Sequence, residues 1–390
     1  MGHLGEVATL FLRLGFTAFG GPAAHIALME DEVVNRRKWI DRQQFLDLVA
    51  AVNFIPGPNS TEMAIHLGML RAGWKGLIVA GGCFIVPAML IILPIGWLYV
   101  HYSSLPNVAG PLMGIRACMI AIIAAAMWGF AKSSIRDWFA GAIAVAAAVA
   151  GFITILPRFR VPQAELIILA MAALAGTMRQ RAGQGSLPLL AVPTTVATTA
   201  VAVSASAKFL QLALFFLKVG ATLFGSGYVL VSYLRGGLVD EKQWLSSQQL
   251  TDAVAVGQFT PGPLLTTATF IGYILGQQWA GPKGAIGGAV LATAAIFFPS
   301  FCFVAALGPL WNRIRTSQRL RGALDGMNAA VVALILVVSI TLGRESIHGI
   351  GTLAIAAISL FLLLKWNLNS TWLIIGSALV GWVLQRFSFA

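Results

Sequence analysis

Long apolar segments alternate with short polar loops along the whole chain. In the first half they fall at about residues 7–28, 45–70, 77–100, 112–131, 138–156 and 163–178, and in the second half at about 208–232, 247–275, 284–310, 325–343, 350–364 and 371–386. Segments of this length cross about 30 Å of hydrocarbon as helices, whereas the strands of a membrane barrel alternate over roughly ten residues. The pattern therefore predicts an all-α polytopic membrane protein.

Two of these segments contain Pro-Gly-Pro where a helix should be uninterrupted. The first copy is Pro56-Gly57-Pro58, followed by Asn59-Ser60-Thr61, and the second is Pro261-Gly262-Pro263. Proline removes a backbone donor and breaks a helix, so each copy predicts a break at membrane depth. A second pair of breaks is expected at Phe19-Gly20-Gly21-Pro22 and at Phe224-Gly225-Ser226-Gly227.

The two sets of breaks belong to an internal repeat. An ungapped offset of 205 residues aligns Pro56 with Pro261, and the same register aligns Trp39 with Trp244, Gln43-Gln44 with Gln248-Gln249, Asp47 with Asp252 and Thr61 with Thr266. Apolar similarity alone would not reproduce these residue types in one register. The chain therefore predicts two homologous halves, residues 1–186 and 208–390. Residues 187–207 between them are either a linker or an extra transmembrane helix.

Loop charge indicates how the breaks lie in the membrane. If both broken segments of the first half crossed the bilayer, the basic loop residues would divide about equally between its sides, against the positive-inside preference. If each segment enters and returns on one side, only Arg158 and Arg160 fall outside. The sequence thus favours two broken or re-entrant helical hairpins in each half, followed by spanning helices. An odd number of spans before the second half would make the halves inverted repeats.

Composition excludes several other classes of protein. The 390 residues are 58% hydrophobic and 10% charged, and the net charge of +12 lies mostly in loops at helix ends. This distribution follows the positive-inside rule, so no nucleic-acid partner is expected. Cys83, Cys118 and Cys302 lie apart in apolar runs, which predicts neither a disulfide nor a metal site. The N-terminus leads straight into the first apolar segment, which predicts no cleavable signal peptide.

The breaks carry groups that suit an oxyanion. A half-helix that starts after Pro58 would present free N–H groups and the positive end of its dipole to an anion. The candidate substrate-binding residues around the breaks are Thr17, Phe19, Gly20, Gly21, Pro22, His25, Asn53, Pro56, Gly57, Pro58, Asn59, Ser60, Thr61, Thr222, Gly225, Ser226, Gly227, Gln258, Pro261, Gly262, Pro263 and Thr266. A structural alternative stays open, because glycine and proline also kink membrane helices and hydroxyls satisfy the carbonyls that a kink frees.

Two titratable side chains follow the first Pro-Gly-Pro motif. Glu62 and His66 are spaced i, i+4 on the predicted half-helix and could couple a proton to transport. The alternative is a helix-start carboxylate and a histidine whose hydrogen bonds are satisfied. In the offset of 205 the second half has Thr267 and Ile271 at these positions, so any coupling belongs to one half only.

Other charges fall inside the apolar segments. Arg13 and Lys218 match across the repeat, and Arg116 lies one turn into another apolar helix. Each is a candidate for substrate charge or coupling, or else it snorkels to the lipid headgroups. Asp47 and Asp252 are interpreted mainly as first-turn or interface residues.

Catalytic motifs do not emerge from the sequence. The histidines form no metalloprotease or triad pattern, and there is no phosphate-binding loop, so we expect no enzyme, no metal and no cofactor. Transport would then depend on ion gradients or on the gradient of the substrate itself. The rival hypothesis is a membrane-embedded enzyme acting on a lipid phosphate, with Glu62, His25 and His66 as its candidate bases.

The motifs together resemble the chromate ion transporter family in its long form with two homologous halves. The resemblance rests on residues 14–28, on Pro56-Gly57-Pro58-Asn59-Ser60-Thr61 and the residues up to Gly68, on residues 70–88, and on the Phe224 and Pro261 motifs of the second half. It implies a secondary transporter in the bacterial inner membrane that exports chromate, a structural mimic of sulfate. Sulfate or a related oxyanion is an alternative substrate, and a homodimer is left open.

Overall fold

The computed structural model describes residues 2–155, 161, 163–181, 205–225, 227–366 and 368–387, and all regular elements in them are helical. The first half contains α1 (His3–Thr17), α2 (Gly21–Glu30), the π-helix η1 (Asp31–Arg36), α3 (Arg42–Val52), α4 (Asn59–Tyr102), α5 (Pro106–Ser134), α6 (Trp138–Ile155) and α7 (Ala164–Arg181). The second contains α8 (Ala205–Thr222), α9 (Val229–Leu234), the π-helix η3 (Arg235–Glu241), α10 (Ser247–Phe259), the 3₁₀ turn η4 (Leu264–Thr266), α11 (Thr267–Thr316), α12 (Gln318–Ser346), α13 (Ile350–Trp366) and α14 (Ser370–Phe387). Most of the expected 187–207 connection lies outside the described residues.

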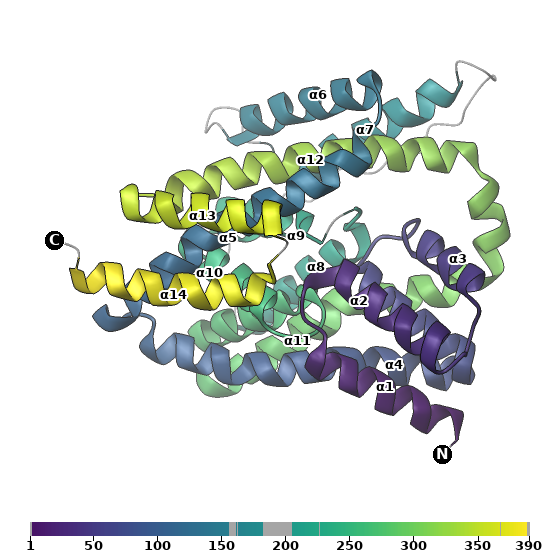
Figure 1. Ribbon diagram of the computed structural model, residues 1–390, viewed down its shortest axis with the longest axis horizontal. Helices are drawn as coiled ribbons and strands as arrows, with labels where there is room; N and C mark the ends of the chain where they lie inside the picture. The colour runs from purple at the N-terminus through teal and green to yellow at the C-terminus, as the bar shows by residue number, and fades with distance from the viewer. Residues whose placement is uncertain are drawn as a thin grey trace.

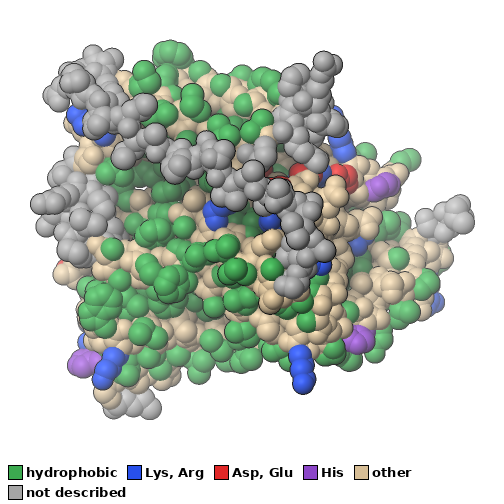
Figure 2. Space-filling model, turned by 180° about the vertical axis from the view of Figure 1, so that it is seen from behind, with side chains coloured by type: hydrophobic (Ala, Val, Ile, Leu, Met, Phe, Trp, Pro, Cys, Tyr) green, Lys and Arg blue, Asp and Glu red, His purple; other side chains and the backbone are tan. Residues whose placement is uncertain are grey.

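The helices have the length and surface of a membrane protein. Five stretches, in α4, α5, α8, α11 and α12, are long and apolar enough to cross a bilayer, and α6 and α13 are shorter apolar helices. Hydrophobic side chains form broad patches on the face seen in Figure 2, and several Lys and Arg side chains lie toward its edges. The prediction of an all-α polytopic membrane protein is therefore confirmed.

The first helices of the chain are too short to span. α1, α2 and α3 have 15, 10 and 11 residues, which corresponds to about 22, 15 and 16 Å at 1.5 Å per residue. The chain turns between α1 and α2 at Gly20, where φ is 101°, and between α3 and α4 at the Pro56-Gly57-Pro58 motif. The pair α1–α2 and the pair formed by α3 and the start of α4 are the broken hairpins that the sequence predicts, and they lie together at the lower right of Figure 1.

A further reversal divides α4. Ala72 and Gly73 leave the helical conformation, with φ of 61° at Gly73, and Gly68 packs directly on Gly76. Residues eight apart in a straight helix are about 12 Å from each other, so this contact requires the chain to fold back. The first part of α4, residues 59–71, is therefore a half-helix, and only the part after Gly73 is a full spanning helix.

The second half repeats this geometry, but with a changed register. α11 leaves the helical conformation at Ala280 and Gly281, where φ is 66°, and Gly276 packs on Gly284. From Asn59 to Thr267, the first residues of α4 and α11, the offset is 208, because the three residues of η4 are inserted after Pro263. The predicted match of Thr61 with Thr266 is therefore wrong, and Thr269 is the structural equivalent of Thr61.

Matched glutamines begin the helices that lead into the Pro-Gly-Pro motifs. The Asp41 side chain accepts a hydrogen bond from the Gln44 backbone at 2.8 Å, while the Gln44 side chain accepts one from the Asp41 backbone at 3.3 Å. Ser246 and Gln249 form the same reciprocal capping box at the start of α10. The repeated glutamine thus sets the first turn of α3 and of α10.

The two halves are related by an inverted repeat. Gly81 of α4 faces the Phe301 ring of α11, and further along α4, Leu93 and Val100 pack in one cluster with Ala285 and Ala289. Residue numbers rise along one helix while they fall along the other, so these equivalent helices are antiparallel, as Figure 1 also shows. A two-fold axis that relates antiparallel spanning helices lies in the plane of the membrane.

The halves also interlock through their later helices. α5 of the first half packs on α14 of the second where Gly114 meets Gly381, and α12 of the second packs on α7 of the first where Gly322 meets Gly176. A Cβ atom at Gly114, Gly176 or Gly381 would overlap the backbone of the partner helix. Small residues allow close approach of membrane helices, so each half is held by the other.

Candidate functional site

The breaks of the two halves meet in two reciprocal pairs. The Gly57 amide donates a hydrogen bond to the Leu223 carbonyl oxygen at 2.7 Å, and the Gly262 amide donates one to the Ala18 carbonyl oxygen at 2.9 Å. Leu223 is the repeat equivalent of Ala18, and Gly262 of Gly57, so the two bonds are reciprocal. Each Pro-Gly-Pro loop is thereby attached to the first break of the opposite half.

The two Pro-Gly-Pro loops have room for no side chain at Gly57 and Gly262. Gly57 has φ of 140°, and a Cβ atom there would overlap the Glu62 carboxyl and lie 2.7 Å from the Ser300 hydroxyl. Gly262 has φ of 92°, and its Cβ atom would lie 2.8 Å from Ala88. Only glycine fits both the backbone angles and the surrounding atoms.

The Gly57 and Gly262 amides therefore are not free donors, contrary to the simplest view of an open helix N-terminus. At the start of α4 the Thr61 and Glu62 amides both donate to the Pro58 carbonyl oxygen, at 2.8 and 3.0 Å. The amides of Asn59 and Ser60 precede them in the first turn, where N–H groups have no partner inside the helix. In the second half the Thr266 hydroxyl bonds to the Pro263 carbonyl oxygen at 2.6 Å, because η4 adds a turn.

Buried polar atoms without internal partners occur on α4, α2 and α11, and those of Glu62 and Ser300 lie beside Gly57. Both carboxyl oxygens of Glu62, the Thr61 and Ser300 hydroxyl oxygens, and one ring nitrogen each of His66 and His25 are buried with no hydrogen-bond partner among the described residues. Glu62 is 0% exposed, and it faces Gly57 together with Ser300 of α11. Buried polar atoms of this kind are normally paired, so their number here points to a bound group or to water.

This cluster is confined to the first half. In the corrected register Phe270 and Ile274 stand at the positions of Glu62 and His66, and Ile92 stands at the position of Ser300. The equivalent of Thr61 is Thr269, whose hydroxyl pairs with Thr293 at 2.7 Å. The sequence prediction that titratable groups belong to one half holds, although the residues opposite them are Phe270 and Ile274 rather than Thr267 and Ile271.

Several predicted binding residues lie at the edge of the breaks. The Thr17 and Thr222 hydroxyls each bond to a carbonyl four residues earlier at 2.8 Å, as hydroxyls do inside helices. The Asn59 side chain bonds to the exposed Asn53 at 2.6 Å, and His25 Nε2 lies 3.1 Å from the Ala18 carbonyl oxygen. Phe19 and Gly20 are exposed, Pro56 and Gly227 are half-buried, Gln258 is buried, and Ser226 lies outside the described residues.

Arg13 is part of a charged cluster with residues of η1. Its guanidinium lies 2.6 Å from the Glu32 carboxylate, which Arg37 also contacts at 3.1 Å. Burial opposes ionisation of Glu32, but the hydrogen bonds from Arg13 and Arg37 outweigh it and lower the pKa of this carboxyl. Lys218, the repeat equivalent of Arg13, is half-buried on α8.

Arg116 has a specific partner in the opposite half. It donates two hydrogen bonds to Asp252 of α10, at 2.8 and 2.7 Å, and the Tyr99 hydroxyl donates a third at 2.7 Å. Asp252 is 2% exposed. Arg116 is therefore neither snorkelling nor free to bind substrate here, and Asp252 is an interface residue, as one of the sequence interpretations has it.

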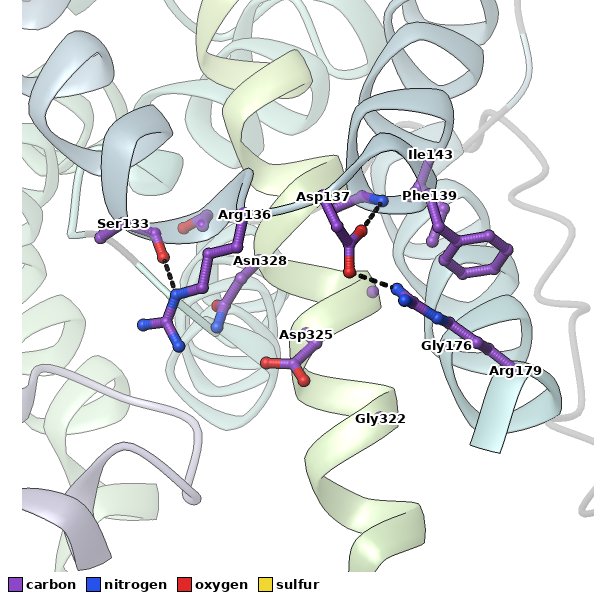
Figure 3. Close-up of a pocket in the computed structure, with 13 residues that line it drawn as sticks. Ser133, Arg136, Asp137, Phe139, Ile143, Gly176, Arg179, Gly322, Asp325 and Asn328 are labelled. Carbon is purple, nitrogen blue, oxygen red and sulfur yellow. Dashed lines mark hydrogen bonds and ion pairs between the residues drawn. The ribbon is translucent and has the colours of Figure 1, made fainter. Parts of the chain in front are cut away.

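A cavity of about 370 Å³ opens between α5, α6, α7 and α12 (Figure 3). Arg136 and Asn328 lie on one side of the cavity, and Asp325 lies near its middle. On the other side Asp137 and Arg179 form an ion pair, with 2.5 Å between Oδ2 and Nη1. The Ala140 backbone amide and Arg179 together lower the pKa of Asp137, which keeps it charged. A Cβ atom on Gly225 would lie 3.3 Å from the Asn328 side chain, so this cavity borders the second-half break. Sequence reasoning did not single out Arg136 or Asn328, because neither lies in a matched motif.

The fold and the crossed breaks define a polytopic membrane protein with the duplicated, inverted architecture of secondary transporters. A family model described as "Chromate transporter" matches the chain twice, over residues 5–177 and 210–382. The chain therefore belongs to the chromate transporter family, and the resemblance expected from its motifs is confirmed.

Curated relatives are similar over nearly the full length. The "Chromate transport protein" of Cupriavidus metallidurans is 31% identical over 97% of this chain and 93% of its own length. That of Pseudomonas aeruginosa is 30% identical over 96% of this chain and 91% of its own length. An "Uncharacterized transporter" of Bacillus subtilis, YwrA, is 27% identical over 126 residues, which is 32% of this chain and 71% of its own length. No solved structure gives a significant match.

Proposed function

We propose that this protein is a secondary transporter that exports chromate across the inner membrane, with sulfate and related oxyanions as competitors. Family membership and the relatives named chromate transport proteins support the substrate. The observation that carries the mechanism is the buried set of unpartnered polar atoms beside Gly57, at the point where the breaks of both halves cross.

The oxyanion is proposed to bind at the start of α4. The Asn59 and Ser60 amides belong to the unpaired first turn, and the hydroxyls of Thr61 and Ser300 are donors that lack a partner. A tetrahedral dianion has oxygens enough to accept from all four groups, and the positive end of the helix dipole favours its charge. Gly57 keeps the loop close to this point, because any larger residue would occupy the space next to Ser300.

Glu62 is proposed to carry the proton that accompanies the anion. A carboxylate next to a dianion in a buried site would repel it strongly, so the anion binds while Glu62 is protonated. His66, one turn further along α4, has an unpartnered ring nitrogen and is the proposed relay toward the surface. No ion pair reaches Glu62 in the described part of the chain.

The membrane potential supplies a sufficient driving force for export. Moving one charge across 100 mV is worth about 2.3 kcal/mol, so an inside-negative potential favours outward movement of a dianion by about 4.6 kcal/mol. When one proton travels with the dianion, the net charge moved is −1, and the driving force from the membrane potential falls to about 2.3 kcal/mol.

Chromate uptake by everted membrane vesicles tests the proposal. Energised vesicles that contain the protein should accumulate chromate, and sulfate and molybdate should inhibit uptake. Uptake no greater than in vesicles without the protein would overturn the proposed function, and chromate uptake that sulfate and molybdate leave unchanged would overturn the general oxyanion site.

A further inference from the structure

Two equivalent helices lie in opposite environments. α10 is buried along the whole stretch Leu250–Gln258, whereas α3 exposes Gln43, Leu46 and Asp47. The short helices of the first half form a hydrophobic cluster of their own, while those of the second half belong to the main core with α5 and α12. The two halves therefore have the same fold, but the hairpin that contains α10 is packed into the core, whereas the hairpin that contains α3 is partly exposed.

The aspartates of these helices show the same difference. Asp252 on α10 is held by Arg116 and Tyr99, which come from α5 and α4 of the opposite half. Asp47 on α3 is exposed, and it accepts a bond from Gln43 of its own helix at 3.3 Å. Leu324 stands at the repeat position of Arg116 and has no charge to offer Asp47. The Arg116–Asp252 ion pair therefore has no counterpart at Asp47, the equivalent aspartate of the first half.

We propose that Arg116, Asp252 and Tyr99 form a latch that closes the second-half side of the transport path and separates in every transport cycle. The inference rests on the proposed transport function. Transporters built from inverted repeats alternate access when one half or bundle moves against the other, so the docked and undocked hairpins correspond to a closed and an open side. Asp252 lies two turns before the Thr260–Pro263 break, so movement of α10 would move that break.

The surroundings of the latch allow it to open. A cavity of about 250 Å³ adjoins it, lined by Ile95, Tyr99, Val256 and Phe259 among others. The exposed side chains of Leu98 and Tyr102 also line it, so it is open on one side and leaves room for the Tyr99 ring and α10 to shift. The Arg116 side chain is 19% exposed, so its charge keeps a route to the surface when Asp252 leaves.

Thiol accessibility in the full-length protein tests the latch. In a background with Cys83, Cys118 and Cys302 replaced by alanine, a Val256→Cys substitution places a buried thiol one turn from Asp252. A membrane-impermeant anionic thiol reagent should modify this thiol slowly in vesicles. Adding Asp252→Asn should raise the rate at least tenfold, and Asp47→Asn, the matched control, should leave it unchanged. Equal rates in the Asp252→Asn and control proteins would overturn the proposal.

A second variant guards against misfolding of the first. Tyr99→Phe removes one hydrogen bond and keeps the ion pair, so it should fold and should raise the modification rate by a smaller factor. If neither Asp252→Asn nor Tyr99→Phe changes the rate while wild-type vesicles transport chromate, the latch is wrong and the proposed function stands. If the rates change but chromate is not transported, the substrate assignment fails and the latch stands.

Discussion

The backbone amide of Gly57 donates a hydrogen bond to the carbonyl oxygen of Leu223, 2.7 Å away in the opposite half of the chain. Its repeat counterpart joins Gly262 to Ala18, so neither Pro-Gly-Pro loop is supported by its own half alone. A broken helix at membrane depth needs partners for its freed backbone groups. Here each half supplies them to the other, which places each Pro-Gly-Pro loop against the first break of the opposite half and Glu62 of α4 beside Gly57.

Gly57→Ala should abolish transport and lower stability. Its φ of 140° is outside the range of residues with side chains, and the new methyl group would overlap Glu62 and Ser300. We expect a loss of about 2–3 kcal/mol and at least a tenfold fall in chromate uptake. Gly82→Ala in α4 is the matched control, since nothing lies within 4 Å of its Cβ position. Wild-type uptake by Gly57→Ala at equal protein levels would contradict the role of this loop.

Glu62→Gln should separate binding from proton coupling. The amide resembles the protonated carboxyl in size and charge, so chromate should still bind. Wild-type uptake is expected to fall as pH rises, because deprotonation of Glu62 places a charge beside the anion site. Uptake by the E62Q variant should be nearly constant between pH 6 and 9 and should no longer respond to a pH gradient. A pH profile identical to that of the wild type would remove Glu62 from the mechanism.

Glu32 should contribute to acid stability. Its pKa is lowered from 4.5 in the folded protein, so its contribution is complete above pH 4.5 and is lost as pH falls through the lowered folded value. Glu32→Gln should reduce stability by about 1–3 kcal/mol at pH 7 and by much less at pH 3. Thermal unfolding in detergent at both values measures this. Asp31→Asn, which removes a neighbouring exposed carboxylate, serves as the control, and an equal effect of the two substitutions at pH 7 would contradict the account.

The inverted repeat predicts that equivalent residues lie on opposite membrane faces. Gln43 and Gln248 match across the repeat, and both are exposed beside their capping boxes. In the cysteine-free background, an impermeant maleimide should label Gln43→Cys from one side of the membrane and Gln248→Cys only from the other. Labelling of both thiols from the same side would show a parallel repeat.

Much of the fold follows from residue types in the sequence. Pro56 and Pro261 break helices wherever they stand, and the matched Gln44 and Gln249 mark two helix starts, so the repeat and its hairpins are predictable. The register after the breaks is not, because the third inserted residue, Thr266, stands opposite Thr61 in the ungapped alignment and hides the insertion. A threonine at position 266 then matches Thr61 by coincidence.

Long-range partners explain the remaining differences. The ion pair of Arg116 with Asp252 joins residues 136 positions apart, and the matching Asp47 makes Asp252 look like a simple repeat feature. The interlocked packing of α5 on α14 leaves only glycines as a signal, Gly114 and Gly381, which are common in membrane helices. Likewise Ser300 approaches Glu62 only because α11 folds against the first half.

The most direct measurement is chromate transport by the purified protein in liposomes under an imposed membrane potential, with wild type, Gly57→Ala and Glu62→Gln compared. We expect potential-dependent chromate uptake that sulfate inhibits in the wild type, none in Gly57→Ala, and uptake insensitive to pH in Glu62→Gln. Wild-type liposomes that take up no chromate under either sign of the potential would contradict the proposed function.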